Sequence, residues 1–370
     1  MLRILTVVGA RPQFIKAAVI SRLLRSGEYS TKMQEYLVHT GQHYDDNMSA
    51  VFFREMEIPS PDCNLEVCSG SHGAVTGAML ARLEEVMLDK RPDAVLVYGD
   101  TNSTLAGALA ASKIHIPVIH VESGLRSFMM AMPEEQNRIV TDRLSTLLFC
   151  PTKTAIQNLQ QEGIVNTTKN KVDADNKGVY LSGDVMYDAS LYYREKLASE
   201  QKSSVLRDIM QNNFYLITIH RAENTDNPKR LSAIVEAINQ FDTQNAVLPL
   251  HPRTRKYLDQ QGLTFKNHVH LIEPVGYFDM LRLESSCEFI VTDSGGVQKE
   301  AYFFKKPCIT LRDSTEWVEL CDHGWNTLAG ADTNAILDAL TNMPKYGDTI
   351  DLYGDGKAGR YIVDKILEVF

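Results

Sequence analysis

Short apolar runs recur along the first half of the chain and alternate with segments whose apolar residues return at helical spacing. A nearly continuous apolar run is typical of a parallel strand buried on both faces. The runs predict strands at residues 2–9, 35–41, 94–99, 117–121, 147–150 and 179–182. The intervening pattern predicts helices at 10–27, 76–88, 101–113, 134–148 and 152–161, and another through Met48, Val51 and Phe52.

The same alternation returns in the second half, after a polar stretch at 163–178 and a charged helical segment at 187–212. Strands are predicted at 215–219, 246–250, 268–272, 289–292 and 308–311, and helices at 228–241, 253–261, 278–286, 297–304, 315–322 and 359–370. Strands that alternate with helices imply parallel sheets joined by right-handed crossovers. We therefore predict an α/β fold of two Rossmann-like domains, residues 1–186 and 187–358, whose parallel sheets face an interdomain cleft.

Residues 289–301, FIVTDSGGVQKEA, combine a strand, a glycine turn and a predicted helix start at Val297. Without side chains at Gly295 and Gly296, an anion can approach the backbone N–H groups, and the helix dipole favours its charge. Glu300, one turn into the helix, is placed to accept from a ribose hydroxyl. The pattern predicts a site for a phosphorylated ligand, although an ordinary strand-to-helix turn would look the same.

Polar side chains follow the predicted strands in both halves. Acid–base chemistry needs a group on each side of the reacting carbon, with environments that push the pKa values apart. The strand ends supply candidates for this role: His39, Asp100, Glu122, His220 and His251. Cations that could clamp a diphosphate are Arg11, Lys16, Arg138 and Arg221.

Each of these residues also has a plain structural interpretation. Asp100 and Glu122 could cap the helices that follow them, and His39 could be a satisfied structural histidine. Arg138 could be solvated or ion-paired within its helix, and His220 could belong to an ordinary helix start. Their grouping around one predicted cleft is stronger evidence for a functional site than any of these residues alone. No usual metal-ligand spacing occurs, so we predict no metal.

Composition limits the partners of the protein. The chain has 370 residues, 44% of them hydrophobic and 23% charged, and a net charge of −9. Without a basic block, neither nucleic-acid binding nor attachment to an anionic membrane is expected. No apolar run approaches the ~20 residues that span a bilayer, and the first residues read as a strand and not a signal peptide. Six scattered cysteines without a CxxC pair indicate reduced thiols in a cytoplasmic protein.

Ten strings lie in order over about residues 4–320: GARPQFIK, HTGQHYD, YGDTNSTLAGALAA, HVESGLRS, MPEEQNR, TIHRAENTD, LHPRT, EPVGYFDM, TDSGGVQKEA and LRDSTEW. Together they closely resemble the non-hydrolysing UDP-N-acetylglucosamine 2-epimerases. The resemblance implies the GT-B architecture, with the UDP-sugar between two Rossmann-like domains and the last helix, 359–370, crossing back to the first domain. It also implies a homodimer that uses no nicotinamide, pyridoxal phosphate or metal.

In that family a base removes the C2 proton of the sugar while UDP leaves C1. UDP then adds back to the bound 2-acetamidoglucal as C2 is protonated on its other face. The resemblance implies four acid–base residues, with the first two favoured for proton transfer at C2: Glu122, Asp100, Glu134 and His220. With the cations above, the contacts to UDP and sugar are Arg11, Lys16, Arg138, Arg221, His251, Phe278 (uracil), Ser294, Gly295, Gly296 and Glu300 (ribose).

The sequence also departs from the familiar pattern of that family. Gln13 stands where Glu is usual, Ser123 replaces Ala, and Trp317 stands where Arg is usual. HTGQHYDDNM replaces the common HTGQHREML, in a segment that helps the family bind an activating second UDP-sugar. The variants look more like the relatives that act on UDP-2,3-diacetamido-2,3-dideoxyglucuronate and make the mannuronate epimer for surface polysaccharide. That substrate is our expectation, with UDP-N-acetylglucosamine as the alternative.

Other functions stay open on the sequence alone. A hydrolysing 2-epimerase would release free sugar and UDP. A GT-B glycosyltransferase would share both sheets and the glycine turn but transfer the sugar to an acceptor. A protein that binds a UDP-sugar without turnover is the plainest alternative, and the acid–base group argues against it.

Overall fold

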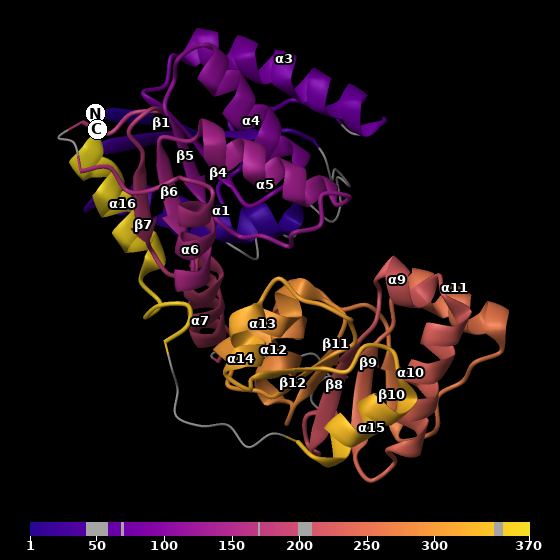
Figure 1. Cartoon of the computed structure of the whole chain (residues 1–370). Helices are drawn as coiled ribbons and strands as arrows, with labels where there is room; N and C mark the ends of the chain where they lie inside the picture. The colour runs from indigo at the N-terminus through magenta and orange to yellow at the C-terminus, as the bar shows by residue number, and fades with distance from the viewer. Residues whose placement is uncertain (42–57, 68–69, 169–170, 199–208, 344–350) are drawn as a thin grey trace. The chain divides into compact units, whose positions relative to one another are not determined.

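The chain divides into two compact units in the computed structural model, which describes residues 1–41, 58–67, 70–168, 171–198, 209–343 and 351–370. The N-terminal unit comprises Met1–Ala189 and Asp351–Phe370, and the C-terminal unit comprises Ser190–Ile350. Each unit has its own parallel sheet with helices around it (Figure 1). The predicted α/β class with two Rossmann-like sheets is therefore confirmed.

The sheet of the N-terminal unit places a switch point between its first and fourth strands. Within the described residues it has seven strands: β1 (Leu2–Val8), β2 (Met33–His39), β3 (Cys63–Asn64), β4 (Ala94–Tyr98), β5 (Val118–Val121), β6 (Leu147–Cys150) and β7 (Gly178–Leu181). They are parallel and follow the order β3-β2-β1-β4-β5-β6-β7. The order reverses between β1 and β4, and ligands of such sheets bind beyond the carboxyl ends at a reversal of this kind.

Helices cover this sheet because each buries one apolar stripe. They are α1 (Arg11–Arg25), α3 (His72–Lys90), α4 (Asn102–Lys113), α5 (Pro133–Leu144), α6 (Lys153–Gln161) and α16 (Ala358–Val369), while α7 (Val185–Ala198) begins in this unit and continues into the C-terminal one. Met79 and Leu83 of α3 pack into one core cluster with alanines of α4. The last helix, α16, packs against α1 and is drawn in yellow beside this unit in Figure 1. Asp188 of α7 accepts the amides of Ala358 (3.1 Å) and Gly359 (2.8 Å), and so caps α16.

The C-terminal unit repeats the arrangement. The part that the structure describes has six parallel strands: β8 (Phe214–Thr218), β9 (Asn245–Pro249), β10 (Val269–Ile272), β11 (Ile290–Thr292), β12 (Cys308–Thr310) and β13 (Asn326–Leu328). Its helices are α9 (Ala222–Thr225), α10 (Pro228–Gln240), α11 (Pro252–Gln261), α12 (Tyr277–Ser286), α13 (Gly295–Phe303), α14 (Val318–Asp322) and α15 (Thr333–Thr341). The strand order, β10-β9-β8-β11-β12-β13, places the switch point between β8 and β11.

The predicted strands are all present, with ends shifted by one or two residues. The apolar pattern does not predict β3, β13, α9 or α15, although Asp332 accepts the amide of Ala335 at 2.8 Å and is a readable start signal for α15. Four predicted helices are corrected. Helix α3 begins at His72 and not at residue 76, because the Ser71 side chain accepts the Ala74 amide and serves as N-cap, and α14 begins at Val318 and not at residue 315. Helix α5 ends at Leu144, well before residue 148, because the chain turns into β6. Helix α13 begins at Gly295 and not at Val297, because the Ser294 hydroxyl accepts the Val297 amide (3.4 Å) and serves as N-cap.

Two predicted helical segments fall wholly or partly outside the residues that the structure describes. The predicted helix through residues 48–52 lies outside the described residues, and so does part of the segment 187–212. Among the helices that are described, none combines the length and apolarity that a bilayer crossing requires.

Gln13 joins the two strands at the switch point of the N-terminal unit. Its side chain is buried, and its carbonyl oxygen accepts the amides of Gly9 (2.8 Å) and Ala10 (3.0 Å). Its amide nitrogen donates to the Tyr98 carbonyl (2.8 Å) and the Thr104 hydroxyl (2.9 Å). Both ends of the side chain are therefore used, and the nitrogen end has to be a donor.

Replacing Gln13 by glutamate should destabilise the protein by about 1–3 kcal/mol, because a carboxylate cannot donate to the Tyr98 carbonyl. The loss should shrink at low pH, where a protonated carboxyl can donate again. Denaturant unfolding at two pH values measures both effects. Gln34→Glu, at an exposed position of β2, is the matched control and should leave the unfolding midpoint in place. An unchanged midpoint for Gln13→Glu would contradict the assigned hydrogen bonds.

Candidate active site

Lys16 and Glu122 form a buried ion pair at the switch point of the N-terminal unit. Lys16 lies on α1, Glu122 follows β5, and the Lys16 ammonium is bonded to the Glu122 carboxylate. Gly99, after β4, has a φ of +62°, and a Cβ there would lie 3.2 Å from Glu122 Oε2 and 3.5 Å from Lys16 Nζ. A glycine is therefore needed for the pair to approach the strand end.

Glu122 has a strained backbone, with a φ of +69°. A non-glycine residue pays to adopt this left-handed conformation and keeps it only when its surroundings hold it. Asp142 of α5 constrains this backbone by contacting residues that precede and follow Glu122 in the chain. One carboxylate oxygen lies 2.7 Å from His120 Nδ1, and the other accepts the Gly124 amide (3.1 Å) and lies 2.8 Å from Arg126.

The Asp142 cluster is closed to solvent and charged. His120 Nε2 lies 2.8 Å from the Gly99 carbonyl oxygen, while its Nδ1 faces the Asp142 carboxylate. Both partners are acceptors, so only a ring with hydrogen on both nitrogens makes both bonds. Burial raises the pKa of Asp142, but the bonds from His120 and the Arg126 charge outweigh it and leave the pKa below 3.8.

Asp100, after β4, is held by Arg138 of α5. Arg138 donates to Asp100 Oδ2 through Nε (3.0 Å) and Nη2 (2.6 Å), and to Glu135 through Nη1 (2.8 Å). Glu135 in turn accepts the amides of Ser127 and Phe128, each at 2.9 Å. Burial raises the pKa of Glu135, but these amide bonds and Arg138 outweigh it and lower the pKa overall. The structure thus pairs Arg138 with carboxylates, while its predicted role as a diphosphate clamp stays a prediction.

The remaining predicted residues of the N-terminal unit are spread around this cluster. Glu134 is exposed in the first turn of α5, next to the buried Glu135. His39 is buried with its ring against Phe14, at a centroid distance of 5.0 Å. Arg11 begins α1, but its side chain lies outside those that the structure describes.

Asp293 organises the switch point of the C-terminal unit. It is fully buried after β11, and it accepts the amides of His220 (3.1 Å) and Arg221 (3.0 Å), which follow β8. Its Oδ1 lies 3.5 Å from His220 Nδ1. Desolvation lowers the pKa of His220, with smaller contributions from Arg221 and His251 and opposition from Asp293. His220 is therefore an uncharged imidazole near neutral pH, able to accept or pass a proton.

The N-terminus of α13 presents backbone donors beside the carboxylate of Glu316 and the guanidinium groups of Arg221 and Arg312. In the described part of the chain, the amides of Gly295 and Gly296 donate to no protein acceptor. A Cβ on Gly295 would lie 2.5 Å from Glu316 Oε1 and 3.5 Å from Arg221 Nη2. Glu316 is paired with Arg312 at 2.8 Å. Burial raises the pKa of Glu316, but Arg312 and then Arg221 outweigh it and lower the pKa, so the anionic oxygen that the two arginines stabilise here is that of Glu316.

Three predicted contacts of the C-terminal unit lie on its helices. Glu300 is buried on α13. Phe278 is buried on α12, with its ring centroid 5.3 Å from that of Tyr193. His251 is exposed, and its Nδ1 accepts the Arg253 amide (3.2 Å) as the N-cap of α11. Their predicted nucleotide contacts stay predictions.

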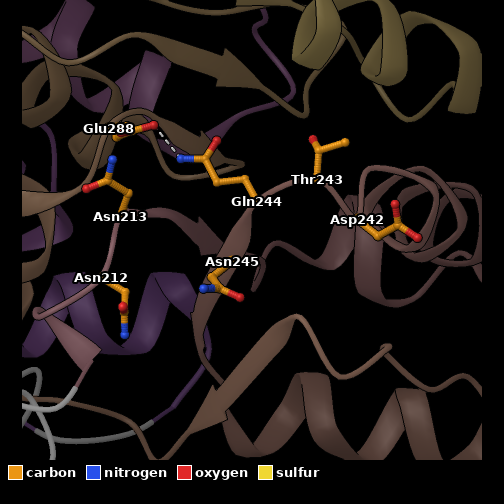
Figure 2. A pocket seen from close by; sticks show the side chains of 7 residues that line it. All are labelled: Asn212, Asn213, Asp242, Thr243, Gln244, Asn245 and Glu288. Atoms are coloured by element: carbon orange, nitrogen blue, oxygen red, sulfur yellow. Dashed lines mark hydrogen bonds between the residues drawn. The ribbon is translucent and has the colours of Figure 1, made fainter.

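A polar hollow of about 460 Å³ lies on the C-terminal unit, away from these residues (Figure 2). Its lining is Asn212, Asn213, Asp242, Thr243, Gln244, Asn245 and Glu288. These residues precede or begin β8, β9 and β11, so they lie at the amino ends of the strands. The hollow is therefore at the edge of the sheet opposite to His220 and Asp293.

Sequence reasoning missed two buried carboxylates of α5, Glu135 and Asp142. Both share a helix face with Arg138, at spacings of three and four residues. An acidic residue at an inward helical position is a readable signal, because a buried charge is retained only with partners. The identity of those partners comes from the fold.

The chain matches a family model described as UDP-N-acetylglucosamine 2-epimerase over residues 26–367. It is 49% identical to the UDP-2,3-diacetamido-2,3-dideoxy-D-glucuronate 2-epimerase of Pseudomonas aeruginosa, covering 100% of both chains. It is 47% identical to a UDP-N-acetylglucosamine 2-epimerase homolog of Methanococcus maripaludis, over 98% of this chain and 99% of the relative. Among solved structures, the UDP-GlcNAc 2-epimerase of Methanocaldococcus jannaschii in complex with UDP-GlcNAc and UDP aligns with a TM-score of 0.84 at 40% identity, covering 99% of each chain.

Proposed function

The chain belongs to the UDP-N-acetylglucosamine 2-epimerase family, and from that premise we propose that it inverts C2 of a UDP-activated 2-acetamido sugar by elimination and re-addition of UDP. Two anchored carboxylates carry the proposal. Glu122, paired with Lys16, and Asp100, paired with Arg138, follow the neighbouring strands β5 and β4. Acid–base chemistry at one carbon needs two such groups in different surroundings.

In the proposed reaction one proton and one UDP group leave the sugar in the first step, and one of each is added in the second. A carboxylate takes the C2 proton, the C–H electrons form the C1=C2 bond, and the C1–O bond breaks with its electrons on UDP. In the return step UDP attacks C1 while the other carboxyl group protonates C2 from the opposite face. No carbon is oxidised or reduced overall, so the reaction calls for no nicotinamide.

The leaving diphosphate needs donors and positive charge more than any other part of the substrate. The free amides of Gly295 and Gly296, with Arg221 beside them, are suited to it. His220, kept uncharged, can pass a proton to or from the leaving phosphate.

For the substrate we propose UDP-2,3-diacetamido-2,3-dideoxy-glucuronate, converted to its mannuronate epimer for surface polysaccharide. Support comes from the Pseudomonas aeruginosa relative of that name, 49% identical over the whole chain. The competing substrate is UDP-N-acetylglucosamine, after which the other relatives are named.

Offering both UDP-sugars in parallel tests the proposal. We expect the diacetamido glucuronate to be turned over at least about tenfold faster, a difference of about 1.4 kcal/mol in transition-state binding. The products should be UDP-sugars with solvent deuterium at C2. Faster turnover of UDP-N-acetylglucosamine would replace the substrate. Free sugar with UDP would indicate a hydrolase, and transfer only with an acceptor would indicate a glycosyltransferase.

The proposal includes a cytoplasmic homodimer. The five cysteines in the described part of the chain are free thiols, which fits a reducing compartment. Sedimentation equilibrium of the purified protein should give twice the 41.5 kDa chain mass, and a monomer would contradict the dimer.

A further inference from the structure

Glu284 of α12 is a buried acid that the reaction above does not use. Its side chain has 0% exposure, and among the described residues no N–H or hydroxyl group donates to either of its carboxyl oxygens. It lies on α12, which contacts α13, and its sequence neighbours Leu283 and Cys287 belong to one apolar cluster with Val297 and Ala301 of α13. An acid in such a place is strongly destabilising if it is ionised without a partner.

The group within hydrogen-bonding reach of Glu284 is the carboxyl group of Glu300, on α13. Two carboxylates side by side cannot both hold a charge. Burial, and then the charge of Glu300, raise the pKa of Glu284 well above its ordinary value. Tyr277 is close enough to be influenced by the charge of both acids, and Cys287 and Cys308 by that of Glu284. Burial raises the pKa of each of them, so they too are neutral near pH 7.

The two acids therefore have different roles. Glu284, with 0% exposure, is closed to solvent and keeps the proton, whereas Glu300 retains 7% exposure and lies in the second turn of α13. A neutral carboxyl group has one O–H to donate, and the Glu300 carboxylate is the acceptor beside it. A hydrogen bond of this kind to a charged acceptor is short and strong, and it fixes the orientation of that acceptor.

We infer that Glu284 is a positioning residue for the nucleotide: as a neutral acid it donates to Glu300 and holds that carboxylate ready to accept from the ribose hydroxyls. The inference rests on the proposed function, which assigns the ribose to Glu300. Glu284 would act through Glu300 without touching the ligand.

Calorimetric binding of UDP and of 2′,3′-dideoxyuridine diphosphate tests this role. The wild type should prefer UDP by about tenfold or more, because a site built to bond hydroxyls rejects the analogue that lacks them. Glu284→Met, of similar size but without a donor, should lose most of that preference and bind the dideoxy analogue as the wild type does. Glu284→Gln keeps an N–H donor and should keep the preference.

Each other outcome overturns the inference. A Glu284→Met protein with the wild-type preference would show that the donor is not needed, and an equal loss for both nucleotides would show a purely structural role. If Glu284→Met does not fold, Glu284→Asp, whose shorter acid falls short of Glu300, must lose the preference while Glu284→Gln keeps it. A wild type that binds neither nucleotide would instead overturn the proposed function.

Discussion

Replacing Glu122 by glutamine should lower turnover of the UDP-sugar by about 10²–10⁴-fold, the usual range for loss of an acid–base group. Glutamine keeps the shape of the side chain and can still accept from Lys16, but it cannot take the C2 proton. Affinity for UDP should stay within about threefold of the wild type, because the proposed diphosphate donors lie on α13. Initial rates, deuterium exchange at C2 and calorimetry with UDP measure the three effects.

Glu85→Gln, at an exposed position of α3 in the same unit, is the matched control and should leave the rate unchanged. A normal rate for Glu122→Gln would remove Glu122 from proton transfer. For Glu122→Gln we expect that turnover and deuterium exchange at C2 are both lost while the affinity for UDP is kept. Loss of UDP affinity as well would indicate that the substitution disturbs the fold around Lys16.

Replacing Asp142 by alanine should cost about 3–5 kcal/mol of stability, the range for removing one partner of a buried charged cluster. His120 and the amide of Gly124 would lose their acceptor, while Arg126 would keep Glu162 at 2.7 Å. Turnover should fall too, because these bonds hold Glu122 in its left-handed conformation. Denaturant unfolding and the rate of any folded fraction measure the two losses.

The acid dependence gives a second readout for Asp142. Because its folded pKa lies below 3.8, its contribution to stability is present above that pH and disappears as the pH falls through the folded value. The wild type and Asp142→Ala should therefore converge in stability at strongly acidic pH. Asp175→Ala, at an exposed position, should behave as the wild type throughout. A stability within about 0.5 kcal/mol of the wild type for Asp142→Ala, the usual scatter of surface changes, would contradict the proposed hold on Glu122.

Much of the fold was readable because parallel strands buried on both faces are apolar along their whole length. The runs that became β1, β4 and β8 need no tertiary information to be recognised. The short strand β13 was not readable, since three residues carry too little pattern. The start of α13 was misplaced by two residues because glycines were read as a turn, although Ser294 already caps the helix at that point.

The sequence predicts which types of residue stand at the strand ends of the candidate site. Asp100, Glu122, His220 and the glycine pair follow strands, and carboxyl ends of parallel strands share one edge of a sheet. Their partners were not readable. The sequence allows Asp100 to cap a helix, and the structure pairs it with Arg138, 38 residues away. The inward acidic positions of Glu284 and Glu300 are readable in the sequence, but their pairing is not, because the two residues belong to different helices.

The sequence by itself determined the class of fold, the two sheets, the family and the residue types offered for catalysis, because burial, helical spacing and strand ends are properties of short windows. The tertiary structure decided which of those residues meet. Lys16 and Glu122 are 106 positions apart, and the strand order that brings them together comes from packing over the whole unit. The strained backbone of Glu122 and the proton kept on Glu284 follow from the same packing, since both depend on neighbours that are distant along the chain.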